Sequence, residues 1–420
     1  MGNIISKNNK DKKIRNTISL CPLTYKEVPA SIIERDKKIY MIKKDDKGDD
    51  IETLIENNNE FYKITHEDSY MSGEYKKIVY DITGRCNLNC PICYRDNKIY
   101  CREPSLEEIK KFASAFSDKL ILLSGGEPTV REDLPEIIKI FSDKTKVILS
   151  TNGIMLADFD YLKLLKKNGL EFVLFAFNGF DDDVYKLING KQLLSIKNKA
   201  LENLKKLKIN TFLSFLLVKE VNESQIMKSL EYYIENRDFI RELRIRSMAY
   251  VGRFIDKRRY SLSEIVDLLA QLLHIDKDVL LREVYFNQKV NRLLKKRAFV
   301  VGSCSIDFHF KVVKGKLIPF GNFLDNERLK KKWGYMYVIT KLIQLYGINS
   351  LFSAGKKIFS YSSKPCFYQN DIVKIGLRSW PDKNNVDLCE GCLTAAFDDQ
   401  GKLRPFCHAN IKKEKKSELL

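Results

Sequence analysis

The strongest constraint on the fold is an alternation of apolar runs with amphipathic segments between residues 75 and 251. The spacing of apolar residues between those runs predicts helices over 105–117, 132–142, 159–167, 191–206 and 223–236. Strands that alternate with helices form parallel βαβ units with right-handed crossovers. We therefore predict an α/β fold built on six strands, YKKIVYDI, KLILLS, KVILST, LEFVLFAF, NTFLSFLLV and ELRIRSMAYV.

The sequence on either side of this core has a different character. Residues 1–74 combine a polar, basic start with short strand-like runs such as KKIYMIKK, which predicts a small N-terminal extension. The core then covers residues 75–255, and residues 256–420 form a C-terminal part that carries cysteines. In that part we expect a helix over 261–275 with a capping box between Ser261 and Glu264, a second helix over 287–299, and hairpins around 314–315 and 399–401.

Composition excludes several classes of protein. The chain has 420 residues, of which 44% are hydrophobic and 30% charged, as in globular proteins. No apolar run approaches the ~18 residues of a membrane span, and the start lacks the apolar region of a secretory signal, so we expect a cytoplasmic protein. The net charge is +18, but the basic residues are dispersed among acidic ones and no nucleic-acid-binding motif accompanies them. We therefore expect no nucleic-acid partner, while peripheral contact with an anionic membrane stays open.

Ten cysteines are distributed in two groups, with Cys21 apart from both. An intracellular chain of this size favours metal-binding or redox cysteines over a disulfide scaffold. The first group is Cys86, Cys90, Cys93 and Cys101, and the second is Cys304, Cys366, Cys389, Cys392 and Cys407.

The loop TGRCNLNCPICYRD follows the first core strand and places Cys86, Cys90 and Cys93 in a C-x3-C-x2-C arrangement. This spacing lets one loop wrap three thiolates around a single cluster. Iron–sulfur clusters normally take four cysteines, so one iron would remain open for a non-protein ligand. On spacing alone, a zinc site completed by Cys101 is the alternative.

Two polar turns follow the next two strands. One is Gly125-Gly126-Glu127-Pro128, where two glycines allow close approach of a ligand and Glu127 places a carboxylate beside it. The other is Ser150-Thr151-Asn152-Gly153, a set of small polar donors and acceptors. Because active-site groups of βα barrels gather at the carboxyl ends of the strands, both turns and the cysteine loop are predicted to face one mouth.

These motifs closely resemble the radical S-adenosylmethionine (SAM) superfamily over residues 75 to 253, apart from Ile92, where many members carry an aromatic residue. The resemblance implies a partial (βα)6 barrel, a 4Fe-4S cluster on Cys86, Cys90 and Cys93, and SAM bound to the open iron. It implies reductive cleavage of SAM to a 5′-deoxyadenosyl radical, with electrons from a flavodoxin or ferredoxin. Glu127 would pair with the SAM ammonium. Other expected cofactor contacts are Gly125, Gly126, Thr151, Asn152, Asn178 and Ser247, with Arg253 as a further candidate.

The second cysteine group is also typical of a metal site. Cys389 and Cys392 form a C-x2-C pair, Cys407 follows across a short hairpin, and Cys304 or Cys366 could complete the set. Zinc fits this spacing. The resemblance favours an auxiliary 4Fe-4S cluster instead, because many radical SAM proteins carry one in such a tail.

Segments near both ends resemble the group that includes archaeal tetraether-lipid synthases and pterin-ring methylases. Members of that group carry a cysteine-rich N-terminal metal site, whereas here Cys21-Pro22 remains and Tyr25 and KKDDKGD stand in place of other thiols. We therefore predict a degenerate metal-binding unit over residues 1–74. The resemblance implies methylation, or carbon–carbon or carbon–sulfur bond formation, on a lipid, pterin or other small molecule. A maturase of peptides and a zinc-stapled binding protein are the alternatives.

Overall fold

The fold was analysed in a computed structural model, which describes residues 11–66, 75–95, 102–249, 251–253, 259–294, 299–302, 304–330, 335–346, 371–387, 392–398 and 400–418. Three cysteines of the predicted metal sites, Cys101, Cys366 and Cys389, lie outside the described residues. None of the described helices combines the length and hydropathy needed to cross a bilayer.

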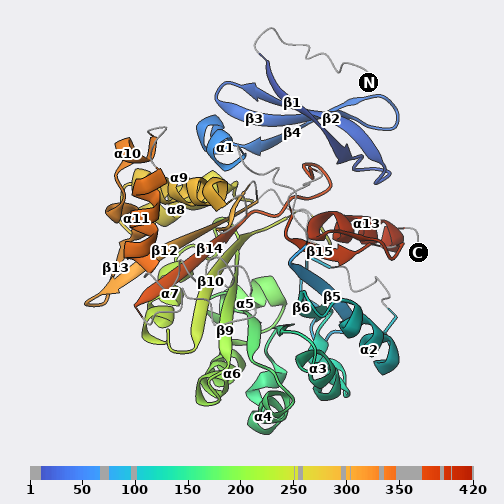
Figure 1. Ribbon diagram of the computed structural model, residues 1–420. Coiled ribbons are helices and arrows are strands. Elements are labelled where there is room, and N and C mark those ends of the chain that lie inside the picture. The colour runs from blue at the N-terminus through green and yellow to red at the C-terminus, as the bar shows by residue number, and fades with distance from the viewer. Residues whose placement is uncertain are drawn as a thin grey trace.

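The centre of the molecule is the parallel sheet that the sequence predicts. All six predicted strands are confirmed, and they lie in the order β10-β9-β8-β7-β6-β5, with neighbouring strands parallel (Figure 1). Their bounds are β5 (Lys77–Thr83), β6 (Leu120–Gly125), β7 (Val147–Thr151), β8 (Phe172–Ala176), β9 (Asn210–Leu217) and β10 (Ile240–Ser247).

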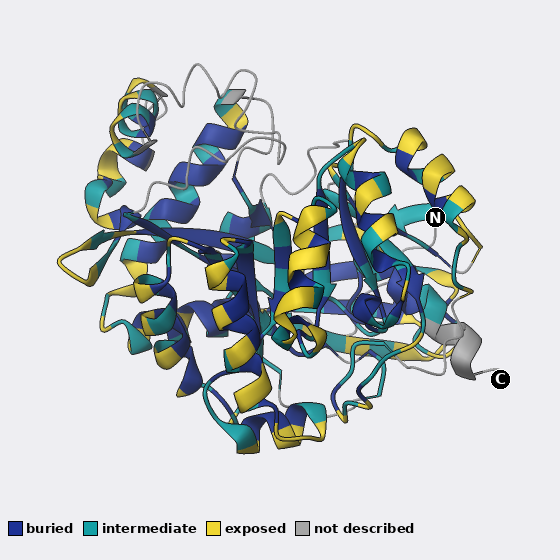
Figure 2. Cartoon of the chain, turned by 90° about the horizontal axis from the view of Figure 1, so that it is seen from below, coloured by how far each residue is buried: buried dark blue, intermediate teal, exposed yellow. Residues whose placement is uncertain are grey.

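Helices cover the outer face of this sheet. The five predicted core helices are present as α2 (Leu106–Ala115), α3 (Leu134–Ser142), α4 (Phe159–Lys167), α6 (Leu194–Lys206) and α7 (Gln225–Glu235). Alternate strand residues such as Leu123, Val173 and Leu213 pack with the helices in one large apolar cluster. Figure 2 shows the result, with dark blue strands inside and helices whose outer faces are yellow.

One core helix, α5 (Asp182–Asn189), was not predicted. Its side-chain cap is Asp181, which accepts a hydrogen bond from the Asp183 amide, and it ends at Gly190 with φ of 77°. Two other short helices also follow strand ends. They are η1 (Pro128–Val130), after β6, and η2 (Met155–Ala157), after β7. A helix of two turns offers too few apolar repeats for a pattern to be recognised.

Strands from the C-terminal part extend the core sheet at both edges. At one edge, β14 (Ile372–Arg378) pairs parallel to β10, and β12 (Ser305–Val313) pairs antiparallel to β14. At the other, β15 (Thr394–Phe397) pairs parallel to β5 and antiparallel to β16 (Leu403–Pro405). The second cysteine group is thereby brought beside the barrel, since Cys392 precedes β15 and Cys407 lies in α13 (Phe406–Glu418).

The remaining C-terminal elements agree in part with the prediction. The capping box between Ser261 and Glu264 begins α8 (Leu262–Leu272), and Lys314 and Gly315 form the turn of the predicted hairpin. The next helix begins well before the predicted position 287. The other elements are α9 (Lys277–Leu294), β11 (Val301–Gly302), β13 (Lys316–Pro319), η3 (Phe320–Phe323), α10 (Asn326–Lys330) and α11 (Tyr335–Tyr346).

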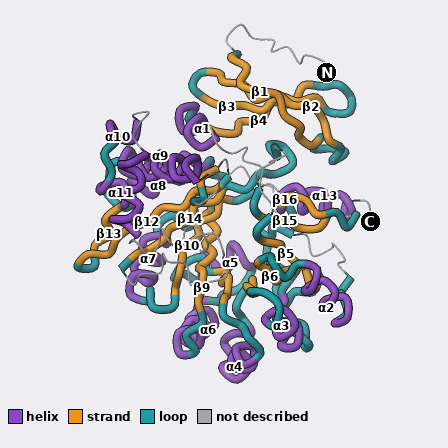
Figure 3. Tube along the Cα trace, in the orientation of Figure 1, coloured by secondary structure: helices purple, strands orange, loops and turns teal. Residues whose placement is uncertain are grey.

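The N-terminal extension forms its own sheet above the barrel (Figure 3). The four strands pair antiparallel in the order β1-β2-β3-β4 and are followed by α1. This sheet is tied to the rest of the chain by Arg15 and Thr17, which both bond the carboxylate of Asp387. The bounds are β1 (Lys12–Leu20), β2 (Glu27–Arg35), β3 (Lys38–Lys44), β4 (Asp50–Glu56) and α1 (Asn59–His66).

Candidate functional site

A pocket of about 440 Å³ lies at the carboxyl ends of the six core strands. The two polar turns and the cysteine loop all contribute to its lining, as the sequence predicts. The second cysteine group reaches it as well, from the C-terminal part. The lining includes these predicted site residues: Cys86, Cys90, Cys93, Gly125, Gly126, Glu127, Thr151, Asn152, Asn178, Ser247, Cys304, Cys392 and Cys407.

The glycine turn is bonded to the start of the cysteine loop. The Gly126 amide donates to the Thr83 carbonyl at 2.8 Å, and the Glu127 amide donates to the Arg85 carbonyl at 2.8 Å. A Cβ on Gly126 would lie 2.3 Å from the Arg85 carbonyl oxygen, so the loop could not approach a larger residue. From the sequence, the two glycines were expected to make room for a ligand. In the structure, the backbone of the cysteine loop fills the space beside Gly126.

The Glu127 carboxylate is 1% exposed and already has partners in the protein. One oxygen accepts hydrogen bonds from the amide and hydroxyl of Thr129 and from the Thr151 hydroxyl, and the other accepts from the Asn152 amide at 2.6 Å. Burial raises the pKa of Glu127, although these donors oppose the shift. In the structure Glu127 thus joins the end of β7 to the end of β6, and its pairing with the SAM ammonium stays a prediction.

Asn152 makes a second connection to the cysteine loop. Its side-chain amide donates to the Asn87 side-chain oxygen at 2.7 Å. The following residue, Gly153, has φ of 80°, and a Cβ there would lie 2.1 Å from the Phe175 ring. The polar turn is therefore closely packed, and its geometry depends on the glycine.

The three loop cysteines are half-buried and lie close enough to influence one another's ionisation. Burial raises the pKa of Cys86 to about 11, with further contributions from Glu127, Cys90 and Cys93. Burial also raises the pKa of Cys90, although a hydrogen bond from the Asn189 amide opposes this shift. Without a bound cation the thiolates of Cys86 and Cys90 are thus disfavoured. In the described part of the chain, no three His, Cys, Asp or Glu side chains are close enough to hold a metal ion as they stand.

Asn178 is connected to the cysteine loop through Asn189. Its side-chain oxygen accepts from the Leu216 amide at 3.1 Å, and its nitrogen donates to the Asn189 oxygen at 3.2 Å. Asn189 in turn donates to the Cys90 sulfur at 3.4 Å. Ser247, the last predicted contact, bonds both backbone groups of Tyr260 and thereby joins β10 to the residues before α8.

Sequence reasoning missed Lys197, which is 1% exposed on α6. Its ammonium donates to the carbonyls of Asn152 at 2.5 Å and Ala176 at 2.6 Å, at the ends of β7 and β8. Burial lowers the pKa of Lys197 to about 8, although Glu127 and Cys90 oppose the shift. A signal was present, because Lys197 lies on the apolar face that includes Leu201 and Leu204.

Arg253 contacts the cysteine loop through its backbone and its side chain. Its amide donates to the Cys93 carbonyl at 3.2 Å, and its guanidinium bonds the Asn89 side chain. Two other guanidinium nitrogens, Nε and Nη2, have no hydrogen-bond partner among the described residues. The positive charge of Arg253 lowers the pKa of Cys90, against the larger effect of burial.

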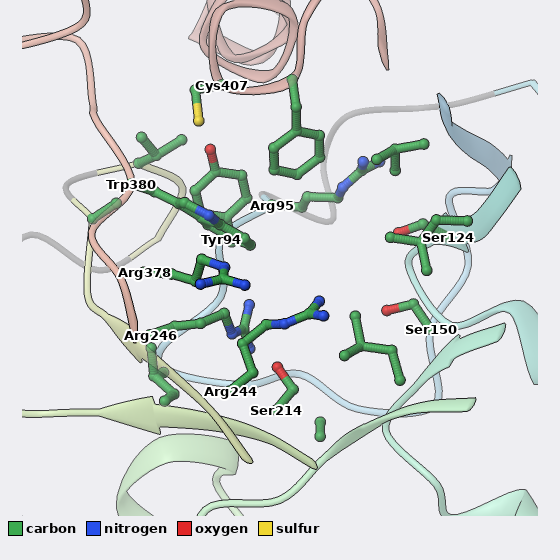
Figure 4. A pocket seen from close by; sticks show the side chains of 18 of the residues that line it. Tyr94, Arg95, Ser124, Ser150, Ser214, Arg244, Arg246, Arg378, Trp380 and Cys407 are labelled. Atoms are coloured by element: carbon green, nitrogen blue, oxygen red, sulfur yellow. The ribbon is translucent and has the colours of Figure 1, made fainter. Parts of the chain in front are cut away.

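The second thiol group occupies the other part of the pocket. Cys392 donates to the Thr394 carbonyl at 3.0 Å, and Cys304 is next to β12. Figure 4 shows Cys407 near Tyr94 and Trp380, at the opposite end of the pocket from Ser150. Arginines and aromatic rings line the pocket beside Cys407, among them Arg246, Arg378 and Trp380.

Comparisons with known proteins show which families the chain is similar to. A model of the radical SAM superfamily matches residues 80–233, and one of the HMPTM N-terminal zinc ribbon domain matches residues 13–44. The chain is 30% identical over 384 residues to 7,8-dihydro-6-hydroxymethylpterin dimethyltransferase of Methanocaldococcus jannaschii, covering 79% of this chain and 74% of the relative. It is 36% identical over 151 residues to a probable GTP 3′,8-cyclase of Methanococcus aeolicus, covering 33% of this chain and 50% of the relative. Streptococcus suis SuiB bound to S-adenosylmethionine matches with a TM-score of 0.39 and 16% identity, covering 47% of this chain and 44% of that one.

The residues of the zinc-ribbon region do not fit a zinc site. Cys21 is the one cysteine between residues 13 and 44. The ammonium of Lys43 is buried beside it and donates to the Leu20 carbonyl at 2.6 Å, the Ser19 hydroxyl at 3.1 Å and the Lys383 carbonyl at 3.0 Å. A cationic side chain thus joins the strands of this unit to the C-terminal part. The loss of the N-terminal metal stays a prediction that zinc analysis tests.

Proposed function

Because the chain belongs to the radical SAM superfamily and is an enzyme of that class, we propose that it modifies an unactivated carbon of a small molecule. The observation that supports this most directly is the gathering of Cys86, Cys90 and Cys93 at the mouth where all six core strands end. The chain covers half of the cyclase relative and three quarters of the methyltransferase, so the reaction and substrate are proposals.

The loop thiols suit a 4Fe-4S cluster by their chemistry. Three half-buried thiols face one pocket, and burial raises the pKa of Cys86 and Cys90, so a bound cation would stabilise their thiolates. Two donors point at the sulfurs, since the Leu88 amide bonds Cys86 at 3.4 Å and the Asn189 side chain bonds Cys90 at 3.4 Å. Such N–H···S bonds accompany iron–sulfur ligation in general. When bound, the cluster and SAM supply the 5′-deoxyadenosyl radical that abstracts hydrogen from the substrate.

The strand ends supply the proposed contacts for SAM. Glu127 holds Thr151 and Asn152 in place rather than offering a free carboxylate, so its proposed role is to position those residues. Gly125 and Gly126 admit the cysteine loop, which places the cluster thiols next to the same turn. Arg253 offers two guanidinium nitrogens to the pocket beside Cys90, which suits a carboxylate of the cofactor.

We also propose an auxiliary 4Fe-4S cluster at the second thiol group. Cys304, Cys392 and Cys407 line the pocket from three separate segments of the chain, and Cys366 and Cys389 belong to the same predicted set. The substrate would then lie between the two clusters. Zinc remains the competitor for this site, because spacing alone suits either.

The substrate tested first is a pterin-type small molecule, as in the methyltransferase relative. A pocket of 440 Å³ suits a compact molecule of this kind. Lipid and peptide substrates are the competing classes, and a low-potential flavodoxin or ferredoxin is the proposed electron donor.

Anaerobic reconstitution tests the proposal. The wild-type protein should bind about four irons per cluster and form 5′-deoxyadenosine from SAM with dithionite as reductant. Replacing Cys86, Cys90 or Cys93 with Ala should abolish product formation, whereas Cys21→Ser, outside the pocket, should retain it. A colourless protein that holds only zinc would disprove the proposal.

A further inference from the structure

Three arginines point into the pocket from one side. Arg244 and Arg246 lie on the barrel-facing side of β10, where even-numbered residues alternate with Leu243 and Ile245 of the outer core. Arg378 reaches the same space from β14, which pairs with β10 in register Arg246 to Arg378. Figure 4 shows the three guanidinium groups side by side. We call these three residues the arginine wall.

Among the described residues, carboxylates bond two of the three arginines of the wall. Glu242 bonds Arg244 at 2.9 Å and also contacts Lys374 and Arg378. Asp307 bonds Lys374 and Arg378, each at 2.7 Å. Those two acids contact Arg244, Lys374 and Arg378, and in the part of the chain that the structure describes neither of them bonds Arg246. Lys77 of β5 is a further cation of the pocket lining.

Arg246 has no carboxylate partner in the described part of the chain, and its Nε is buried without a hydrogen bond. Its guanidinium lies 5.0 Å from the centre of the Trp380 ring. Burial lowers the pKa of Arg246 to about 10, with Arg244 adding to the effect. Burial also lowers the pKa of Lys77 to about 7, and Arg244 and Arg378 lower it further. Buried charges in folded proteins are normally paired, so the buried Arg246 guanidinium indicates an absent anion.

A second unsatisfied donor lies beside the wall. The Ser214 hydroxyl, on β9 next to β10, is buried without a hydrogen-bond partner among the described residues. It faces the pocket near Arg244, and Ser150 and Ser124 face it from the other side (Figure 4). Guanidinium and hydroxyl donors converging on one space match the oxygens of a phosphate or carboxylate.

We propose that the substrate carries an oxyanion group, a phosphate or a carboxylate, which the arginine wall binds with Ser214 as a further donor. This rests on the proposed function, because it specifies the substrate class of the same pocket. The anion would hold the substrate at β10 and β14 and present the rest of the molecule toward the cysteine loop.

Calorimetric titration of the reconstituted holoenzyme with inorganic pyrophosphate and with citrate tests the proposal, at fixed ionic strength and without SAM or reductant. The wild-type protein should bind at least one of the two probes. Arg246→Gln should weaken binding by about tenfold or more, as expected for loss of a charge-assisted hydrogen bond. Arg241→Gln, which removes the same charge from the outer face of β10, should bind like the wild type.

The two probes distinguish the sources of the oxyanion. Binding of pyrophosphate alone identifies a phosphate, and binding of citrate alone identifies a carboxylate. If neither binds, or if Arg246→Gln binds like the wild type, the proposal is wrong. Arg246→Lys, which keeps the charge, should retain part of the affinity if Arg246→Gln is poorly folded.

Iron analysis provides a second criterion. Arg246→Gln should keep the iron content of the wild type, and loss of iron with unchanged probe affinity would assign Arg246 to a cluster instead. Formation of 5′-deoxyadenosine is measured separately, so failure of the proposed function and failure of anion binding give different results.

Discussion

The side-chain amide of Asn189 donates a hydrogen bond to the sulfur of Cys90 at 3.4 Å. Asn189 ends α5, the helix that the sequence pattern did not reveal, and Asn178 holds its side chain from the end of β8. A polar network from outside the cysteine loop therefore reaches one of its three thiols.

Replacing Asn189 with Ala should lower the reduction potential of the cluster proposed on this loop. A hydrogen bond to a ligating sulfur stabilises the reduced, more negatively charged cluster, and the substitution removes it. A redox titration followed by electron paramagnetic resonance measures the potential. Asn168→Ala, outside the pocket, is the control and should leave it unchanged. An equal potential in both variants would show that the Asn189 bond does not act on the cluster.

Glu127→Gln should destabilise the pocket and weaken SAM binding together. The carboxylate accepts hydrogen bonds from Thr129, Thr151 and Asn152, and an amide nitrogen would face these donors. The expected loss of stability is about 1–3 kcal/mol, because buried donors lose their acceptor. Chemical denaturation and equilibrium dialysis with SAM measure the two effects. Unchanged stability with lost SAM binding would instead favour direct pairing with the SAM ammonium.

Lys197→Met should destabilise the fold, whereas Lys199→Met, on the exposed side of the same helix, should not. The substitution leaves the buried carbonyls of Asn152 and Ala176 without the Lys197 donor, which costs about 1–3 kcal/mol. Urea denaturation of both variants provides the comparison. Equal midpoints would contradict a role for the ammonium in joining the ends of β7 and β8.

Lys43 should make stability depend on pH above neutrality. Burial lowers the pKa of Lys43 from an ordinary 10.5 to about 8, so between these values the unfolded chain binds more protons than the folded one. The contribution is complete above pH 10.5 and is lost as the pH falls to about 8. Stability should therefore rise with pH in this window by up to about 3 kcal/mol more in the wild type than in Lys43→Met.

Lys44→Met is the matched control for Lys43, since Lys44 is exposed at the end of the same strand. Denaturation at pH 7.5 and pH 10 measures the difference. Equal pH dependence in wild type and Lys43→Met would show that the ammonium is not buried in the folded state. Zinc analysis of the same samples should find no metal bound to the N-terminal sheet, and stoichiometric zinc that Cys21→Ser removes would contradict this expectation.

The sequence alone determined the core fold and the location of the site. Most strands of the barrel are apolar along most of their length, and each of the predicted core helices has an apolar face, so local patterns suffice to place them. The same holds for Cys86, Cys90 and Cys93, whose spacing within one loop is visible in the chain. The sequence also predicted the turn at Gly125 correctly. It did not predict that the backbone of Thr83 and Arg85 packs against this turn.

Tertiary structure decided which distant residues share the pocket. β15 pairs with β5 more than 300 positions earlier in the chain, and this pairing brings Cys392 and Cys407 beside the first strand. The arginine wall joins β10 to β14, whose partner no local pattern identifies. Local sequence specifies the periodicity of apolar residues and the spacing of cysteines within a loop, because both depend only on neighbouring residues. The pairing of strand edges and the burial of charges such as Lys197 and Arg246 depend on contacts that form only when the whole sheet assembles.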